Sequence, residues 1–334
     1  MSIRIYPSTY KDQPSLTIES ELLRAQFLPE IGAKMASLVY KQRNFELLVQ
    51  RPGGKYLIQP FDGVYTDGEC SGFDDMFPTI DTCFYDRYPW EGIKMADHGE
   101  VWSLPHTFEM EGDRLHFKVN GIRFPYCLEK WVSFIAPNIL HLEYQLTNLT
   151  PYNLDFVWAG HMMFNLEEGV ELSLPKGVRK ISHTFGIGAE IAQYGDVLDW
   201  PISTLSDGTT RDFRHIRPKS TCLADKYYIK GRMPEGWCGL KYTNSNFSLA
   251  LSFPNETVPY LGVLPNEGGW QDLYNIFLEP CTATFDRPDI ARYRGECSTI
   301  KGNSSYTWYL NISLAEGVDF QRINSTGHFE LGEP

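Results

Sequence analysis

Tyr126-Cys-Leu-Glu-Lys-Trp-Val-Ser-Phe134 and Ile139-Leu-His-Leu-Glu-Tyr-Gln-Leu-Thr-Asn148 are neighbouring runs in which apolar and polar residues alternate. A period of two is typical of antiparallel strands that bury one face. The pattern continues outward along most of the 334 residues, and the other principal strands that it predicts are 15–19, 22–28, 33–40, 115–119, 155–158, 247–253, 260–264, 274–278 and 305–314. The sequence therefore predicts an all-β chain.

Helical periodicity is scarce in this sequence. Short helical turns are expected near 189–197 and 288–293, and no long amphipathic helix is predicted. The chain has 28 Gly and 21 Pro, many of them at the ends of apolar runs, which indicates frequent turns. No repeat or linker interrupts the pattern. We therefore expect one large antiparallel β-sandwich domain that spans residues 1–334.

Charge and cysteine content narrow the functional classes. The formal net charge is −12 without a concentrated basic patch, which argues against nucleic acid and anionic membranes as partners. The seven cysteines lack Cys-x-x-Cys spacing, so neither a zinc site nor a disulfide framework is expected. There is no signal-peptide pattern, and no apolar stretch approaches the ~18 residues of a membrane span. We expect a cytoplasmic protein that needs no cofactor and no metal.

Three short segments carry side chains suited to proton transfer at neutral pH. They are Asp97-His98-Gly99-Glu100, Trp158-Ala159-Gly160-His161 and Leu278-Glu279-Pro280, and each lies in or just after a strand-like run. Two imidazoles and one carboxylate are sufficient for general acid–base chemistry. Because they are far apart in the sequence, only the fold can bring them together.

Each candidate also has a structural interpretation. His98 could cap a turn by a hydrogen bond, and His161 could be a buried, hydrogen-bonded side chain. Glu279 follows the predicted strand 274–278; its apolar neighbours could desolvate it and raise its pKa, or solvent could leave it unperturbed. Trp102 and Trp270 could stack on a sugar ring or fill the core.

The order of these segments, together with Asp74-Asp-Met-Phe-Pro-Thr-Ile80, resembles the aldose 1-epimerase (galactose mutarotase-like) family over nearly the whole chain. The resemblance implies a β-supersandwich fold and interconversion of the α and β anomers of a free sugar. It implies that Glu279 is the base on the anomeric hydroxyl and His161 the acid on the ring oxygen. It also implies that His98 hydrogen-bonds the sugar near that oxygen.

The chain departs from that family at several positions. Many sugar mutarotases carry an Arg upstream of the first His, but Asp75 and its neighbours occupy that stretch here, so we expect Asp75 to take over hydroxyl recognition. Trp102 stands where the hexose-6-phosphate branch places an Arg, which argues against a phosphosugar. Asp225 is the candidate for the family's sugar-binding Asp after the central His.

Two alternative functions remain open on the sequence. A sandwich that uses Trp90, Trp102 and Trp270 as stacking surfaces could bind or sense carbohydrate without converting it. A hexose-6-phosphate epimerase is the other alternative, disfavoured by the missing Arg. The leading prediction is an aldose 1-epimerase-like isomerase of carbohydrate metabolism whose partner is a small neutral sugar.

Overall fold

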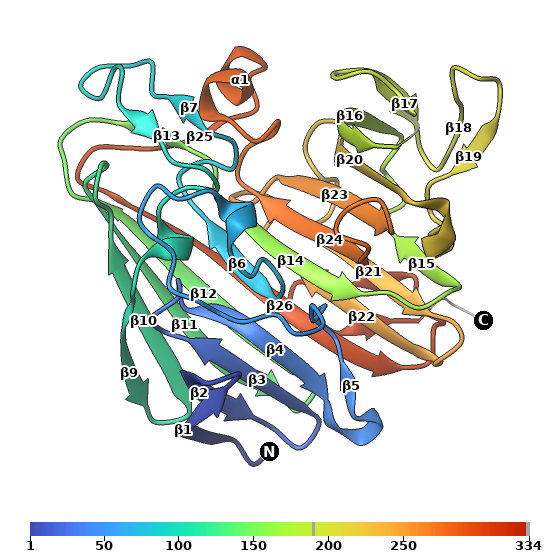
Figure 1. The fold of residues 1–334 in the computed structure, drawn as a ribbon, viewed down its shortest axis with the longest axis horizontal. Helices are drawn as coiled ribbons and strands as arrows, with labels where there is room; N and C mark the ends of the chain where they lie inside the picture. Colours follow the sequence, from blue (N-terminus) through green and yellow to red (C-terminus); the bar gives the residue numbers. More distant parts are fainter. Residues whose placement is uncertain (189–190, 332–334) are drawn as a thin grey trace.

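Two large antiparallel sheets form the computed structural model, which describes residues 1–188 and 191–331 (Figure 1). The larger sheet has 12 strands. Their order is β1 (Arg4–Tyr10), β2 (Gln13–Glu19), β3 (Leu23–Leu28), β4 (Lys34–Tyr40), β6 (Phe73–Met76), β14 (Ala159–Asn165), β24 (Tyr274–Cys281), β23 (Tyr260–Glu267), β20 (Leu223–Ile229), β16 (Lys180–Ile187) and β17 (Val197–Asp199), and β5 (Phe45–Glu46) pairs with β4.

The second sheet has eight strands. Their order is β15 (Val170–Ser173), β21 (Trp237–Tyr242), β22 (Phe247–Ser252), β26 (Ser305–Glu316), β12 (Ile139–Asn148), β11 (Tyr126–Ala136), β10 (Arg114–Asn120) and β9 (Thr107–Glu111). The smaller pairs are β7 (Cys83–Phe84) with β8 (Lys94–Met95), β13 (Leu154–Phe156) with β25 (Ser298–Ile300), β18 (Ile202–Thr204) with β19 (Thr210–Asp212), and β27 (Arg322–Ile323) with β28 (Phe329–Glu330).

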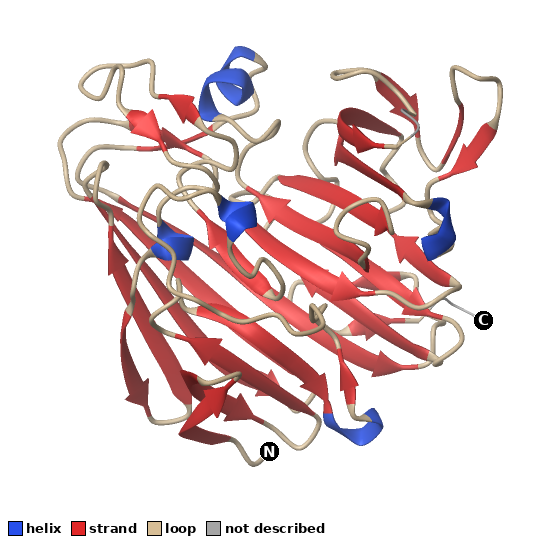
Figure 2. Cartoon of the chain, viewed as in Figure 1, coloured by secondary structure: helices blue, strands red, loops and turns tan. Residues whose placement is uncertain are grey.

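Helix is a minor component of the described chain, as Figure 2 shows. The α-helix α1 spans Pro288–Tyr293, which confirms the helical turn expected there. The turn expected near 189–197 is wrong in its described part, because bends and turns occupy 191–196 before β17 begins; residues 189 and 190 lie outside the described residues. Short 3-10 helices occupy Lys41–Arg43, Tyr65–Asp67, Val101–Ser103 and Lys219–Thr221. In the described residues, no helix is both long and apolar enough to span a bilayer.

Alternation along the strands creates the core between the two sheets. The opening pair of runs forms β11 and β12, in which Leu128 faces Leu146 and Val132 faces Leu142 across the register, all four buried. Burial of such cross-strand apolar pairs is the main source of sheet stability. The all-β prediction is confirmed.

Two strand limits differ from the prediction in a way that affects the site. Strand 155–158 stops at Phe156, because the Val157 N–H donates to the Pro78 carbonyl and the Trp158 N–H to Thr282 Oγ1 instead of to a partner strand. A new strand, β14, then contains His161 in its interior. Strand 274–278 continues to Cys281, so Glu279 lies within β24 and not at its end.

Candidate active site

A row of polar side chains crosses the middle of the larger sheet on the face away from the core. Adjacent strands place Asp74 opposite His161, and Glu279 opposite Gly262, which in turn lies opposite Tyr228. The Nε2 atom of His161 lies 3.7 Å from Oε1 of Glu279. Because successive strand residues point to opposite faces, the residues next to these pack into the core between the sheets.

The loop after β8 brings His98 over this row. Its ring stacks on Tyr65 with 4.2 Å between centroids and lies 5.5 Å from the His161 ring. His98 has a φ of 57°, and a Cβ atom added to the following Gly99 would lie 2.1 Å from the Phe77 carbonyl oxygen. Only glycine fits that close backbone approach, which explains the His-Gly pair in the sequence.

Tyr65 and Asp74 set the orientation of His161. The Tyr65 hydroxyl donates to Asp74 Oδ2 over 2.7 Å, and Lys34 Nζ lies 2.6 Å from the same oxygen. Tyr65 has one proton to donate, so its oxygen accepts from His161 Nδ1–H at 3.4 Å. The other ring nitrogen, Nε2, is thereby left for the pocket and for Glu279.

Burial perturbs both candidate catalytic groups in opposite directions. Desolvation lowers the pKa of His161 well below its ordinary value, and the charges of His98 and Lys226 act in the same direction. Desolvation raises the pKa of Glu279, whereas the ammonium of Lys226 opposes that rise. Burial therefore shifts the proton preference of the pair from His161 toward Glu279, and Lys226 opposes that shift at Glu279.

Lys226 supplies the counter-charge for Glu279. Its Nζ lies 2.8 Å from Glu279 Oε2 and 2.8 Å from Asp286 Oδ1, which also accepts from the Tyr228 hydroxyl over 2.5 Å. Burial disfavours the charge on Lys226, but attraction to Asp286 and Glu279 outweighs it and raises the pKa. Within the described chain, neither buried carboxylate oxygen of Glu279 has a hydrogen-bond partner; Oε2 is ion-paired with Lys226, and Oε1 lies 3.7 Å from His161 Nε2.

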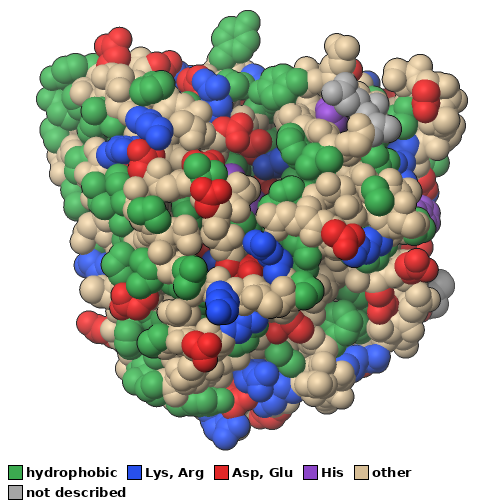
Figure 3. Space-filling view, in the orientation of Figure 1, with side chains coloured by type: hydrophobic (Ala, Val, Ile, Leu, Met, Phe, Trp, Pro, Cys, Tyr) green, Lys and Arg blue, Asp and Glu red, His purple; other side chains and the backbone are tan. Residues whose placement is uncertain are grey.

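A pocket of about 120 Å³ opens over His98 and His161, whereas Glu279 is fully buried and is not among the residues that line it. Figure 3 shows this face of the molecule. It is hollowed between the elements at the upper left of Figure 1 (β7, β13 and α1) and those at the upper right (β16 to β19). The residues that line the pocket are Tyr65, His98, His161, Phe185, Ala224, Leu264, Trp270 and Phe277. The fold thus brings His98, His161 and Glu279 together from three distant segments. The two histidines line the pocket with Trp270, and Glu279 lies buried beside His161.

The three tryptophans singled out in the sequence have different environments. Trp270 lines the pocket, with its ring centroid 6.2 Å from that of Phe277. Trp102 is buried behind Tyr65, and its Nε1 donates to the Asp97 carbonyl over 2.9 Å, so it supports the loop that carries His98. Trp90 packs in the core with Tyr85.

The structure does not bring Asp75 or Asp225 to the pocket. Asp75 lies on the inner face, where Oδ1 accepts from Trp158 Nε1 over 3.0 Å and Oδ2 pairs with Lys130 Nζ at 2.8 Å. Asp225 is buried and pairs with Arg217 over 3.3 Å. Strand alternation explains both positions, because the neighbours Asp74 and Lys226 occupy the outer face instead.

Sequence reasoning missed five groups that shape the site: Lys34, Tyr65, Asp74, Lys226 and Asp286. The parity of strands could have identified two of them, since Asp74 is opposite His161 and Lys226 follows the same alternation in β20. Tyr65 begins a short 3-10 helix and Asp286 lies in a turn, and no local pattern in the sequence marks them.

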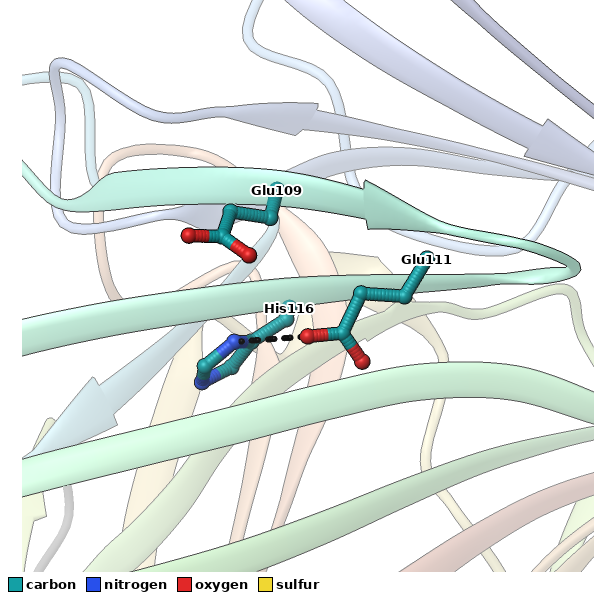
Figure 4. Close-up of side chains that lie close together, drawn as sticks. All are labelled: Glu109, Glu111 and His116. Atoms are coloured by element: carbon teal, nitrogen blue, oxygen red, sulfur yellow. Dashed lines mark ion pairs between the residues drawn. The ribbon is translucent and has the colours of Figure 1, made fainter.

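A separate group of possible metal ligands lies on the second sheet, where Figure 4 shows Glu109, Glu111 and His116. Two of its three donors, Glu111 and His116, are already occupied by protein partners. Arg114 Nε donates to Glu111 over 2.8 Å, and His116 lies 3.3 Å from Glu111 and 3.1 Å from Glu129 through its two ring nitrogens. An adjacent guanidinium and an engaged imidazole do not suit a divalent cation, so the group is best described as a surface ion-pair network.

Comparison with solved structures gives the fold its class. The chain is similar to a galactose mutarotase-like protein from Clostridium acetobutylicum, with a TM-score of 0.64, 13% identity, and coverage of 94% of this chain and 99% of the other. A galactose mutarotase-like protein from Lactobacillus casei matches with a TM-score of 0.61, 18% identity, and coverage of 90% and 100%. A galactose mutarotase related enzyme from Lactobacillus acidophilus matches with a TM-score of 0.60, 12% identity, and coverage of 96% and 100%.

These matches confirm a galactose mutarotase-like fold, as the sequence resemblance implied. At such identities the likeness concerns the fold alone. No protein-family model matches the chain, and no curated protein matches it. The function must therefore be argued from the side chains of the site.

Proposed function

We propose that this chain is an aldose 1-epimerase-like isomerase that interconverts the α and β anomers of a neutral free sugar, with residues 1–334 acting as one domain. The observation that carries the proposal is the pair formed by His161 and Glu279, in which Nε2 lies 3.7 Å from Oε1. The ring of His98 lies close to that of His161, and both histidines line the pocket. An acid and a base at this separation can act on two oxygens bonded to one carbon atom.

The proposed reaction transfers two protons and breaks one ring bond. Glu279 takes the proton of the anomeric hydroxyl while the imidazolium of His161 donates Nε2–H to the ring oxygen. The C1–O5 bond breaks, and the electron pair of the former O1–H bond forms the aldehyde. Rotation about C1–C2 presents the other face of the aldehyde, and ring closure returns both protons with the roles reversed.

The pKa directions fit these roles. Lys226 favours an ionised Glu279 at 2.8 Å, which keeps the base available in a buried site. The lowered pKa of His161 makes its imidazolium a stronger acid toward the weakly basic ring oxygen, although fewer molecules carry that proton at neutral pH. His98 would hydrogen-bond the sugar next to that oxygen, held in place by its 2.8 Å contact with Asp97.

The charge distribution supports a neutral substrate. Among the described residues that line the pocket there is no Lys or Arg. The two nearby lysines are buried against carboxylates, Lys34 against Asp74 and Lys226 against Glu279. A phosphosugar would need free cations in this place, and bidentate arginine contacts would be the usual means.

Anomer exchange measured by NMR on freshly dissolved sugars tests the proposal. Glu279→Gln and His161→Ala should each lower kcat/KM by about 10²–10⁴, the usual contribution of one positioned acid or base. His141→Ala is the matched control, since that histidine lies on the second sheet and bonds Asn311. The proposal fails if no sugar of a broad panel equilibrates faster with the protein, or if both site variants keep the original rate.

Carbohydrate binding without turnover is the second candidate. It is favoured by the lowered pKa of His161, which leaves the acid role dependent on a minor protonation state, and by Trp270 in the pocket wall. Calorimetry that detects sugar binding in the absence of any anomer exchange would select this function over the first.

A further inference from the structure

The polar row of the site is bordered by an apolar row on the same face of the sheet. Phe277 lies two residues before Glu279 on β24, opposite Met163 on β14 and Leu264 on β23. Two residues along a strand correspond to about 7 Å. A sugar with its anomeric centre over the polar row therefore extends onto the apolar row.

The residues that line the pocket are likewise divided into a polar group and an apolar group. Five of its eight residues carry hydrophobic side chains other than Tyr65, and they are Phe185, Ala224, Leu264, Trp270 and Phe277. The polar lining residues are partly engaged, since Tyr65 donates to Asp74 and His98 Nδ1 contacts Asp97. The ring nitrogens Nε2 of the two histidines remain, and the proposed reaction uses both at the anomeric centre.

Phe277 indicates which part of the sugar meets the apolar row. Its ring centroid lies 4.7 Å from that of His161, the proposed donor to the ring oxygen. The ring oxygen is bonded to both C1 and C5. When the hydroxyl on C1 meets Glu279 and C5 lies on the side of Phe277, the substituent on C5 falls beside Phe277 and its cross-strand neighbour Leu264. Aromatic rings can stack on the C–H face of any pyranose, but a hydroxyl that is buried against these side chains loses its hydrogen bonds to water.

We infer that the substrate is a 6-deoxyhexose, a sugar with a methyl group on C5 in place of a hydroxymethyl group, and that Leu264 and Phe277 enclose this methyl. The inference rests on the proposed function and adds a substrate class to it. Burial of an unpaired hydroxyl against apolar side chains should disfavour the hydroxylated sugar by about 5- to 150-fold in kcat/KM, which is ~1–3 kcal/mol at 1.4 kcal/mol per tenfold.

Matched pairs of sugars that differ only in the C6 hydroxyl provide the test. The pairs are L-fucose with L-galactose, D-fucose with D-galactose, L-rhamnose with L-mannose, and 6-deoxy-D-glucose with D-glucose. Anomer exchange is measured by NMR for each, and in at least one pair the deoxy sugar should have the higher kcat/KM by about fivefold or more. If sugars react but no pair shows this preference, the inference is overturned while the proposed function stands. If no sugar reacts, the proposed function fails and the inference with it.

Variants at Leu264 provide a second, independent readout. Leu264 is only partly buried, which favours a folded variant. Leu264→Gln places an amide beside the C6 position and should reduce the deoxy preference toward one, because the hydroxyl regains a partner. Leu264→Met keeps the apolar character and should keep the preference. If the ratio of kcat/KM between the deoxy sugar and its hydroxylated partner is unchanged in Leu264→Gln, the placement of C6 against Leu264 and Phe277 is wrong.

Discussion

Replacement of Lys226 by Met tests how the buried carboxylates of the site are kept charged. The ammonium lies 2.8 Å from Glu279 and 2.8 Å from Asp286, and all three side chains are buried. Unit charges about 4 Å apart attract by ~4 kcal/mol at an effective dielectric constant of 20. Loss of one partner from a buried ion pair costs about 3–5 kcal/mol, so we expect a destabilisation in that range at pH 8.

The pH dependence of this loss has a defined sign. Without Lys226, nothing in the pair offsets the desolvation of Glu279, so its pKa rises further above the ordinary 4.5. A carboxyl with a raised pKa in the folded state binds its proton more tightly there than in the unfolded chain. The folded variant is therefore destabilised as pH rises above 4.5, and the stability difference from the original protein should shrink on acidification. Urea unfolding of both proteins at a series of pH values measures this difference in the free energy of unfolding.

The same substitution should change the pH profile of catalysis. Because Glu279 must be ionised to act as the base, the acid limb of the kcat/KM profile should move to higher pH in Lys226→Met. Asp286→Asn should move that limb to lower pH, since the negative charge of Asp286 raises the pKa of Glu279. Opposite displacements by two neighbouring substitutions are not expected from a general loss of packing.

Lys130→Met is the matched control for this experiment. Lys130 is also a buried lysine paired with a carboxylate, 2.8 Å from Asp75, but it lies on the inner face of the sheet. We expect a comparable loss of stability without a displaced acid limb. A limb that moves equally in the Lys130 and Lys226 variants, or in neither, would refute the reasoning.

Three further substitutions separate positioning from structure. Tyr65→Phe removes the acceptor of His161 Nδ1–H and should lower kcat about 2- to 12-fold, corresponding to one hydrogen bond of ~0.5–1.5 kcal/mol, with KM less affected. Gly99→Ala should lower Tm by more than Gly112→Ala. Both glycines have a positive φ, 80° and 65°, but the new Cβ lies 2.1 Å from a carbonyl oxygen at Gly99 and meets nothing within 4 Å at Gly112. Asp75→Asn breaks the buried pair with Lys130 and should lower the free energy of unfolding by about 3–5 kcal/mol, while kcat/KM per folded molecule is kept. A loss of activity without a loss of stability would instead support a role of Asp75 in sugar recognition.

The sequence predicted the sheets well because apolar and polar residues alternate along each strand. This pattern is local, and it arises wherever one face of a sheet is buried. Runs such as Ile139–Asn148 became strands with the expected limits. Of the expected site residues, His98, His161 and Glu279 are the ones that the fold brings close together, and each lies in a short recognisable segment; their roles stay a prediction. The choice between Asp74 and Asp75 required the strand parity relative to His161, which depends on pairing between segments far apart in the chain.

The proposed reaction would exchange protons in both directions between two buried groups, His161 and Glu279. In that proposal, ring opening and ring closing use the same two groups in opposite roles, so neither group should hold the proton much more tightly than the other. Ordinary glutamate and histidine differ, at 4.5 and 6.5, and burial raises the first while it lowers the second. Lys226 limits the rise at Glu279 and also disfavours the charge on His161, so one lysine tunes both partners. A histidine acting as the sole counter-ion of Glu279 would hold its proton too tightly to release it to a sugar oxygen, and the pairing of Glu279 with Lys226 avoids this.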